Sequence, residues 1–164
     1  HGDLGVAEDW ASAPEDRRQF FMAYEAYEGG VELSAGYRWL PGPASGVSPS
    51  NVVVPLAWGN ASHISCKGPD GACLISTGPG TGTEGVTAGW QPFENELFIA
   101  YIRGGVRRIA HTRTTACGYW SQPRASWSRD GRFVIWSSDW GVNQCPGSTD
   151  EVGNADPYVI DLSL

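Results

Sequence analysis

Short apolar runs separated by turn residues recur along most of the chain. The clearest example is residues 123–141, PRASWSRDGRFVIWSSDWG, in which Asp130-Gly131 separates two runs rich in Trp, Val, Ile and Ser. Runs of about four to eight residues bounded by Gly, Pro, Asp and Asn are typical of β-strands. Apolar and polar positions alternate only in part, which favours strands buried on both faces. The pattern therefore predicts an all-β protein.

The Asp130-Gly131 dipeptide predicts a tight hairpin turn. A two-residue connection between antiparallel strands needs positive φ, which Gly adopts without a Cβ clash and which Asp tolerates. The same pattern occurs earlier in residues 63–78, HISCKGPDGACLISTG, where a polar lead-in precedes Asp70-Gly71 and an apolar run follows it. Asp70 and Asp130 are 60 positions apart.

A second pair of segments has the same spacing. ENELFIAYI at 94–102 matches NADPYVIDL at 154–162, and Glu96 lies 60 positions before Asp156. A weaker third copy, EDRRQFFMAYEA, stands at 15–26. Self-similarity at a fixed period indicates a repeat architecture. The spacing predicts one region with approximate repeats at 1–58, 59–116 and 117–164.

The last copy carries a resemblance to a known family. SWSRDGRFVIWSSDWG followed by DPYVIDL is similar to the blade motif of TolB-like β-propellers, in which a Ser-x-Asp-Gly turn links the inner strands and an Asp-Pro-Tyr-Val-type strand follows. The match is strong over 123–162, fair over 61–102 and weak over 1–40. The resemblance implies a fold and leaves the function open, because many unrelated proteins share such blades.

A β-propeller-type chain of about three four-stranded blades does not make a complete wheel. Propellers close radially with about four to eight blades. Three copies therefore predict a partial propeller, or one closed by self-association or by a partner chain. The alternative is a β-sandwich whose hairpins mimic blades.

Composition limits the classes of function. The formal net charge is −7 and no basic cluster exists, so we expect no nucleic-acid partner. No apolar run reaches the roughly 18 residues that a membrane-spanning helix needs, so we expect no membrane span. Eight Trp in 164 residues is a high content. Trp is used in cores and in sugar-binding surfaces.

The four cysteines predict disulfides. Cys66 and Cys73 flank a turn, and Cys117 and Cys145 flank the hairpin at 123–141. The pairings 66–73 and 117–145 are the simplest of three connectivities; buried free thiols are the alternative. Disulfides indicate an extracytoplasmic or secreted protein.

The lead-in segments of the three copies are candidates for a shared site. If the copies fan around one axis, the start of the chain, His63 and residues 122–124 meet at one rim. His1, Asp3 and His63 then form a candidate site for a divalent metal. The alternative is that each His caps a turn or bonds a backbone carbonyl. A copper site at His1, completed by His63 or His111, requires residue 1 to be the mature N-terminus.

Residues 111–124 are the richest in binding groups. Arg can bind a carboxylate with two hydrogen bonds, and aromatic rings can stack on a sugar. A lyase also needs Arg to neutralise a uronate and Tyr or His to move protons. The candidate catalytic residues are His63, Tyr119 and Arg124, and the candidate ligand-binding residues are His111, Arg113, Trp120 and Gln122. The alternative is that Tyr119 and Trp120 fill a core between blades.

These observations predict a secreted binding module that recognises a carbohydrate or protein ligand at the rim around the central axis. The alternative is an enzyme, a lyase acting on acidic polysaccharide with or without a metal. Glu94 and Glu96 share one strand face and have no partner visible in the sequence.

Overall fold

Every regular element that the structure describes is a β-strand, so the predicted all-β class is confirmed. The computed structural model describes residues 7–12, 18–27, 30–39, 51–56, 61–69, 71–79, 92–115, 121–141 and 155–163. Within these ranges, no helix has the length and apolar character needed to cross a bilayer.

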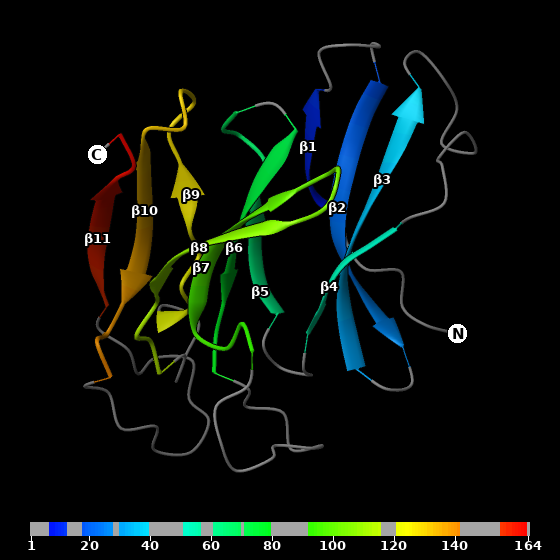
Figure 1. Ribbon diagram of the computed structural model, residues 1–164. Helices are drawn as coiled ribbons and strands as arrows, with labels where there is room; N and C mark the ends of the chain where they lie inside the picture. Colours follow the sequence, from blue (N-terminus) through cyan, green and yellow to red (C-terminus); the bar gives the residue numbers. More distant parts are fainter. Residues whose placement is uncertain are drawn as a thin grey trace.

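The described strands form three antiparallel sheets, which follow one another from right to left in Figure 1. Sheet A contains β1 (Ala7–Ser12), β2 (Arg18–Tyr27), β3 (Gly30–Trp39) and β4 (Asn51–Leu56). Sheet B contains β5 (Ala61–Ser65), β6 (Ala72–Thr77), β7 (Glu96–Tyr101) and β8 (Val106–His111). Sheet C contains β9 (Ser126–Trp127), β10 (Phe133–Ser138) and β11 (Asp156–Asp161).

Each sheet is a simple meander, because strands that are consecutive in sequence are neighbours in the sheet. Sheets A and B have four described strands in this order, and sheet C has three. None of the three closes on itself. Sheet A spans residues 7–56, sheet B residues 61–111 and sheet C residues 126–161.

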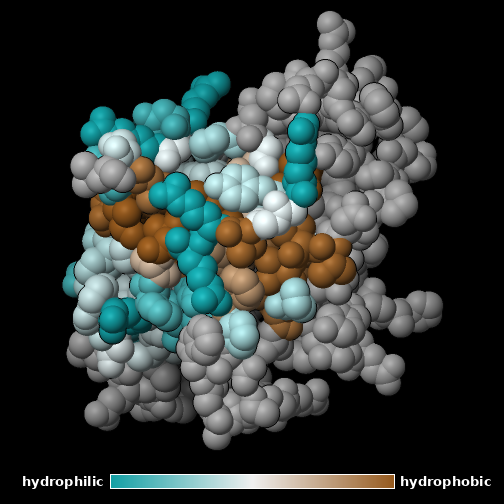
Figure 2. Space-filling model, in the orientation of Figure 1, coloured by the Kyte–Doolittle hydropathy of each residue, from teal (hydrophilic) through white to brown (hydrophobic). Residues whose placement is uncertain are grey.

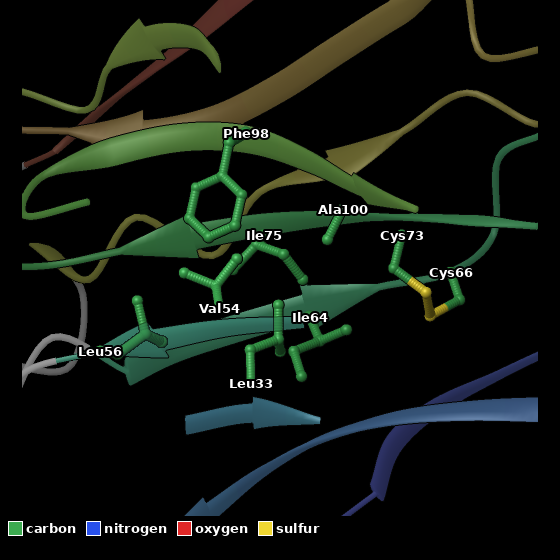
Figure 3. Close-up of a cluster of buried hydrophobic side chains, with 9 residues drawn as sticks. All are labelled: Leu33, Val54, Leu56, Ile64, Cys66, Cys73, Ile75, Phe98 and Ala100. Carbon is green, nitrogen blue, oxygen red and sulfur yellow. A yellow bond between two sulfur atoms is a disulfide. The ribbon is translucent and has the colours of Figure 1, made fainter. Parts of the chain in front are cut away.

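Sheet B lies between sheets A and C, and one of its two faces packs against sheet A. Ile75 of β6 and Phe98 of β7 are fully buried on this side, where they meet Leu33 of β3 and Val54 of β4. Figure 3 shows these side chains converging between the two sheets.

The other face of sheet B packs against sheet C. Leu74 and Leu97 point this way and meet Val134, Trp127 and Trp136. Successive residues of β6 and β7 thus enter two different cores, because side chains alternate across a strand. All six residues of β6 are buried for this reason. Burial on both faces explains the partial alternation of the sequence.

A disulfide closes the hairpin between β5 and β6. Cys66 and Cys73 are bonded, which confirms the predicted pairing. Cys117 and Cys145 lie outside the described residues.

The hairpin between β9 and β10 differs from the predicted two-residue turn. The Ser128 N–H donates to the Phe133 carbonyl at 2.8 Å, so the connection is longer. Gly131 has φ 71°, whereas Asp130 keeps negative φ. The Asp130 carboxylate accepts hydrogen bonds from the Ser128 hydroxyl at 2.5 Å and the Arg132 N–H at 3.1 Å, which lower its pKa below 3.8. Asp130 therefore acts as an acceptor that orders the turn.

The repeat spacing corresponds to equivalent places in sheets B and C. Glu96 is the first residue of β7, and Asp156, which lies 60 positions later, is the first residue of β11. The strands β6 and β10 begin 61 positions apart, at Ala72 and Phe133. One residue, Arg132, separates Gly131 from β10, whereas Gly71 directly precedes β6, so β10 begins one position later than the 60-residue spacing predicts.

Candidate functional site

The two ends of sheets B and C differ in their connections. At one end, short hairpins join consecutive strands at 66–71, 102–105 and 128–132. At the other end, long connections follow β6, β8 and β10 at 78–95, 112–125 and 139–155. Binding groups concentrate on long loops that a rigid scaffold carries. We call this second end the loop rim.

Residues with a strained backbone conformation lie at the loop rim. Four residues other than Gly have positive φ in the described part of the chain, namely Phe93 (65°), Asn95 (53°), Arg113 (53°) and Trp140 (52°). All four lie in the connections of this rim. A left-handed backbone is costly for bulky residues and persists only where the surroundings enforce it. The positions of these side chains are therefore fixed by their neighbours.

Trp140 is the outermost member of an aromatic cluster at the loop rim. It is 50% exposed. Its ring stacks on Tyr158 with the centroids 5.0 Å apart, and Tyr158 lies 5.5 Å from the buried Trp136. The Arg113 guanidinium carbon lies 5.4 Å from the centroid of the Trp140 ring. Trp136, Tyr158, Trp140 and Arg113 are called the Trp140 cluster below.

Polar groups hold Arg113 and Trp140 in place. The Ser138 hydroxyl donates to the Arg113 carbonyl at 3.0 Å and accepts from the Trp140 N–H at 3.0 Å. The carboxylate of the buried Asp139 accepts hydrogen bonds from the N–H and the hydroxyl of Thr115. Ser138 and Asp139 thus join the loop after β8 to the loop after β10, which brings the cation and the indole together.

The Trp140 cluster has the chemistry to hold a sugar or a carboxylate. An exposed indole offers a flat apolar surface, and a guanidinium can bind a carboxylate with two parallel hydrogen bonds. Within the described ranges, no carboxylate pairs with Arg113. The positive charge beside Trp140 is therefore not neutralised by a partner from these ranges.

Two of the predicted site segments are neighbours. The Ser76 hydroxyl donates to the His63 carbonyl at 3.4 Å and accepts from the Ala125 N–H at 3.2 Å. Arg124, next to Ala125, is exposed, and its Nη2 donates to Gln122 Oε1 at 3.1 Å. The half-buried His63 and the segment 122–124 therefore lie on the same rim.

His111 and Glu96 pair across β8 and β7 at the loop rim. The sequence leaves Glu96 without a partner, but Arg108 Nε lies 2.9 Å from its Oε2 atom. The Arg108 guanidinium also lies 4.7 Å from the centroid of the Phe93 ring. The side chain of Glu96 is almost completely buried, so this ion pair fixes a strand end.

Several predicted site residues lie outside the described part of the chain: His1, Asp3, Tyr119 and Trp120. Within the described ranges, no three His, Cys, Asp or Glu residues are grouped in a way that could hold a metal ion. The metal site of His1, Asp3 and His63 includes two residues outside these ranges, so it stays a prediction. The catalytic roles of His63, Tyr119 and Arg124 also stay predictions.

Sequence reasoning missed every member of the Trp140 cluster except Arg113, and it missed the two residues that hold the cluster, Ser138 and Asp139. The Asp139-Trp140-Gly141 tripeptide carries a recognisable pattern, because Asp and Gly place the intervening Trp in a turn beyond the strand. Tyr158 lies inside a strand, and only the register of β10 and β11, which pairs it with Trp136, brings it to the cluster.

No protein-family model, curated protein or solved structure matches this chain. The fold and the rim alone therefore define its class. It is an all-β protein of three antiparallel meander sheets with an aromatic and cationic cluster on the loops at one end.

Proposed function

We propose that this chain is a secreted, propeller-type binding module whose loop rim takes a carbohydrate through the Trp140 cluster. The observation that carries the proposal is the half-exposed Trp140 ring beside the Arg113 guanidinium, held by two loops joined at Asp139. The disulfide between Cys66 and Cys73 supports an extracytoplasmic location, because disulfides persist in oxidising compartments.

Three features support the propeller interpretation. Each sheet is a meander, adjacent sheets pack face to face, and the first strands of the sheets lie near one another, since β5 approaches both β1 and β9. Meander sheets arranged radially around their first strands are the plan of a β-propeller. In this arrangement the loop rim is one face of a disc.

The chemistry of the cluster favours acidic sugars. Stacking on an aromatic ring binds the apolar face of any pyranose, whereas the guanidinium adds a charge-assisted interaction only where the sugar has a carboxylate. We therefore expect polyuronates to bind more tightly than neutral polysaccharides.

Affinity electrophoresis in gels that contain a polyuronate or a neutral glucan tests the proposal. We expect Trp140→Ala to weaken binding to both polymers by about tenfold or more, which corresponds to about 1.4 kcal/mol. Arg113→Gln is expected to remove only the preference for the polyuronate. Tyr101→Ala is the matched control, because it removes an exposed aromatic ring at the hairpin end of β7.

Two results would overturn the proposal. One is wild-type protein that none of the polymers retards, and the other is Trp140→Ala protein retarded as strongly as the wild type. The near-ultraviolet circular dichroism of each variant shows whether the fold is retained.

The proximity of His63 to the Arg124 segment favours polyuronate lyase activity as a second candidate function. Arg124 would neutralise the uronate, and His63 would move a proton. A lyase that cuts a polyuronate in solution leaves unsaturated chain ends, which absorb ultraviolet light. A rise in absorbance that His63→Ala and Arg124→Ala both abolish would favour the enzyme, and no rise with wild-type protein would exclude it for that polymer.

A further inference from the structure

Strand β10 is apolar on both faces, although only one face is covered within the described part of the chain. Val134 and Trp136 are buried against sheet B. Phe133 is 39% exposed and Ile135 is 47% exposed on the opposite face. Val159 of β11, the cross-strand partner of Ile135, is 61% exposed. Figure 2 shows hydrophobic side chains on the left of the molecule, where Figure 1 places β10 and β11.

An antiparallel sheet with one face in water normally carries polar residues on that face. A patch of Phe, Ile and Val side chains in its place indicates a contact surface. The name outer face is used below for the side of sheet C formed by Phe133, Ile135 and Val159.

The outer face corresponds to a face that is buried in sheet B. The strands β10 and β6 start 61 positions apart, and β11 and β7 start 60 positions apart. With these offsets, Ile135 occupies the place of Leu74, and Val159 occupies the place of Ile99. Leu74 and Ile99 are buried against sheet C. Sheet C therefore exposes the same side that sheet B uses to receive the next sheet.

We propose that the outer face of sheet C receives a second copy of this chain, whose sheet A takes the place that sheet C has against sheet B. The argument is continuity, because the outer face continues the series of sheet-to-sheet interfaces from A to B and from B to C. Two copies related by a two-fold axis bury the outer face twice and form a closed pair. The pair contains six sheets, within the range of about four to eight that closes a propeller. The closure of six sheets into a ring rests on the propeller arrangement proposed above. The equivalence of the outer face of sheet C to the face of sheet B that packs against sheet C does not depend on that arrangement.

Sedimentation equilibrium of the purified protein tests this inference. We expect the wild type to have twice the chain mass of 17.6 kDa. The double substitution Ile135→Lys with Val159→Glu is expected to restore the mass of one chain. Because these residues are cross-strand partners, the new charges lie opposite each other and support the sheet while they make its outer face polar.

The matched control is Val106→Lys, which charges an exposed Val of β8 in sheet B and is expected to leave the dimer intact. If the double variant does not fold, Ile135→Thr with Val159→Thr makes the same face polar with residues that favour strands. Wild-type protein with the mass of one chain at every concentration would overturn the inference, as would folded outer-face variants that remain dimers. Sugar binding at the loop rim is measured separately, so failure of one proposal is distinguishable from failure of the other.

Discussion

Asp161 is a half-buried carboxylate that its neighbours hold in the charged form. Arg132 Nη2 donates to Asp161 Oδ2 at 3.0 Å, and the hydroxyl and N–H of Ser163 donate to Oδ1 at 2.6 and 2.9 Å. The Arg132 guanidinium, followed by the two Ser163 donors, lowers the pKa of Asp161 far below its usual 3.8. The ion pair joins the turn before β10 to the end of β11.

Asp161→Asn is expected to remove a stabilisation that depends on pH. Because folding lowers the pKa of Asp161, its carboxylate contributes fully above the unfolded pKa of about 4, and the contribution is lost as the pH falls toward the folded pKa. We expect the variant to melt at a lower temperature than the wild type at about pH 7, with a smaller difference at about pH 3. Thermal unfolding followed by circular dichroism measures both. A difference that is equal or larger in acid would contradict the assignment.

The hairpin of β5 and β6 is the element with the strongest local constraint. Its two strands are joined by the disulfide between Cys66 and Cys73, and both cysteines are buried in the core shared with sheet A. Cross-linking a short loop stabilises the fold mainly because it restricts the unfolded chain. Among the described residues, hydrogen bonds of Ser138 and Asp139 join the loops of the loop rim.

Replacing both cysteines by Ala tests the contribution of this link. A loop of about eight residues gives an entropic stabilisation of about 2.5 kcal/mol, so we expect the free energy of unfolding to fall by about 2 to 3 kcal/mol. Urea denaturation followed by circular dichroism gives the value. Wild-type protein treated with a reductant is the control and should unfold at a similar urea concentration. If both forms keep the midpoint of the oxidised wild type, the disulfide does not stabilise the fold.

At the scale of the whole molecule, sheets B and C also meet through their hairpins. A Cβ atom on Gly68 would overlap the indole of the buried Trp127, and a Cβ atom on Gly131 would overlap the ring of Pro69. The absence of side chains at these two glycines allows the β5–β6 hairpin to lie against β9 and its turn. The contact adds to the apolar packing of Leu74 against Val134 and Trp136.

Gly68→Ala is expected to push sheets B and C apart at this point. Overpacking of a well-filled contact costs about 1 to 3 kcal/mol, so the variant should unfold at a lower urea concentration. Combining Gly68→Ala with Trp127→Leu removes the ring that the methyl group would strike, and the double variant should lose less stability than the sum of the two single changes. Strict additivity would show that the effect of Gly68→Ala does not come from a clash with the Trp127 ring.

Features set by neighbouring residues in the chain could be predicted from the sequence. Runs of apolar residues between turns gave the all-β class, and a turn flanked by cysteines gave the Cys66–Cys73 disulfide. The 60-residue spacing located equivalent strands, because Glu96 and Asp156 start the third strand of sheets B and C. The repeat also predicts that His63 lies near residues 122–124, and in the structure Ser76 bonds both the His63 carbonyl and the N–H of the adjacent Ala125.

Tertiary structure alone decided which residues form the site and which strand faces are covered. Arg113 and Trp140 meet because Ser138 and Asp139 join two loops that are far apart in the sequence. The face of β10 that enters the core depends on Arg132, the one residue between Gly131 and the strand, since a shift of one position sends every side chain of a strand to the opposite face. Local patterns specify turns and strands through short-range sterics and hydrogen bonding, but contacts between loops and the choice of face arise only when the sheets pack against one another.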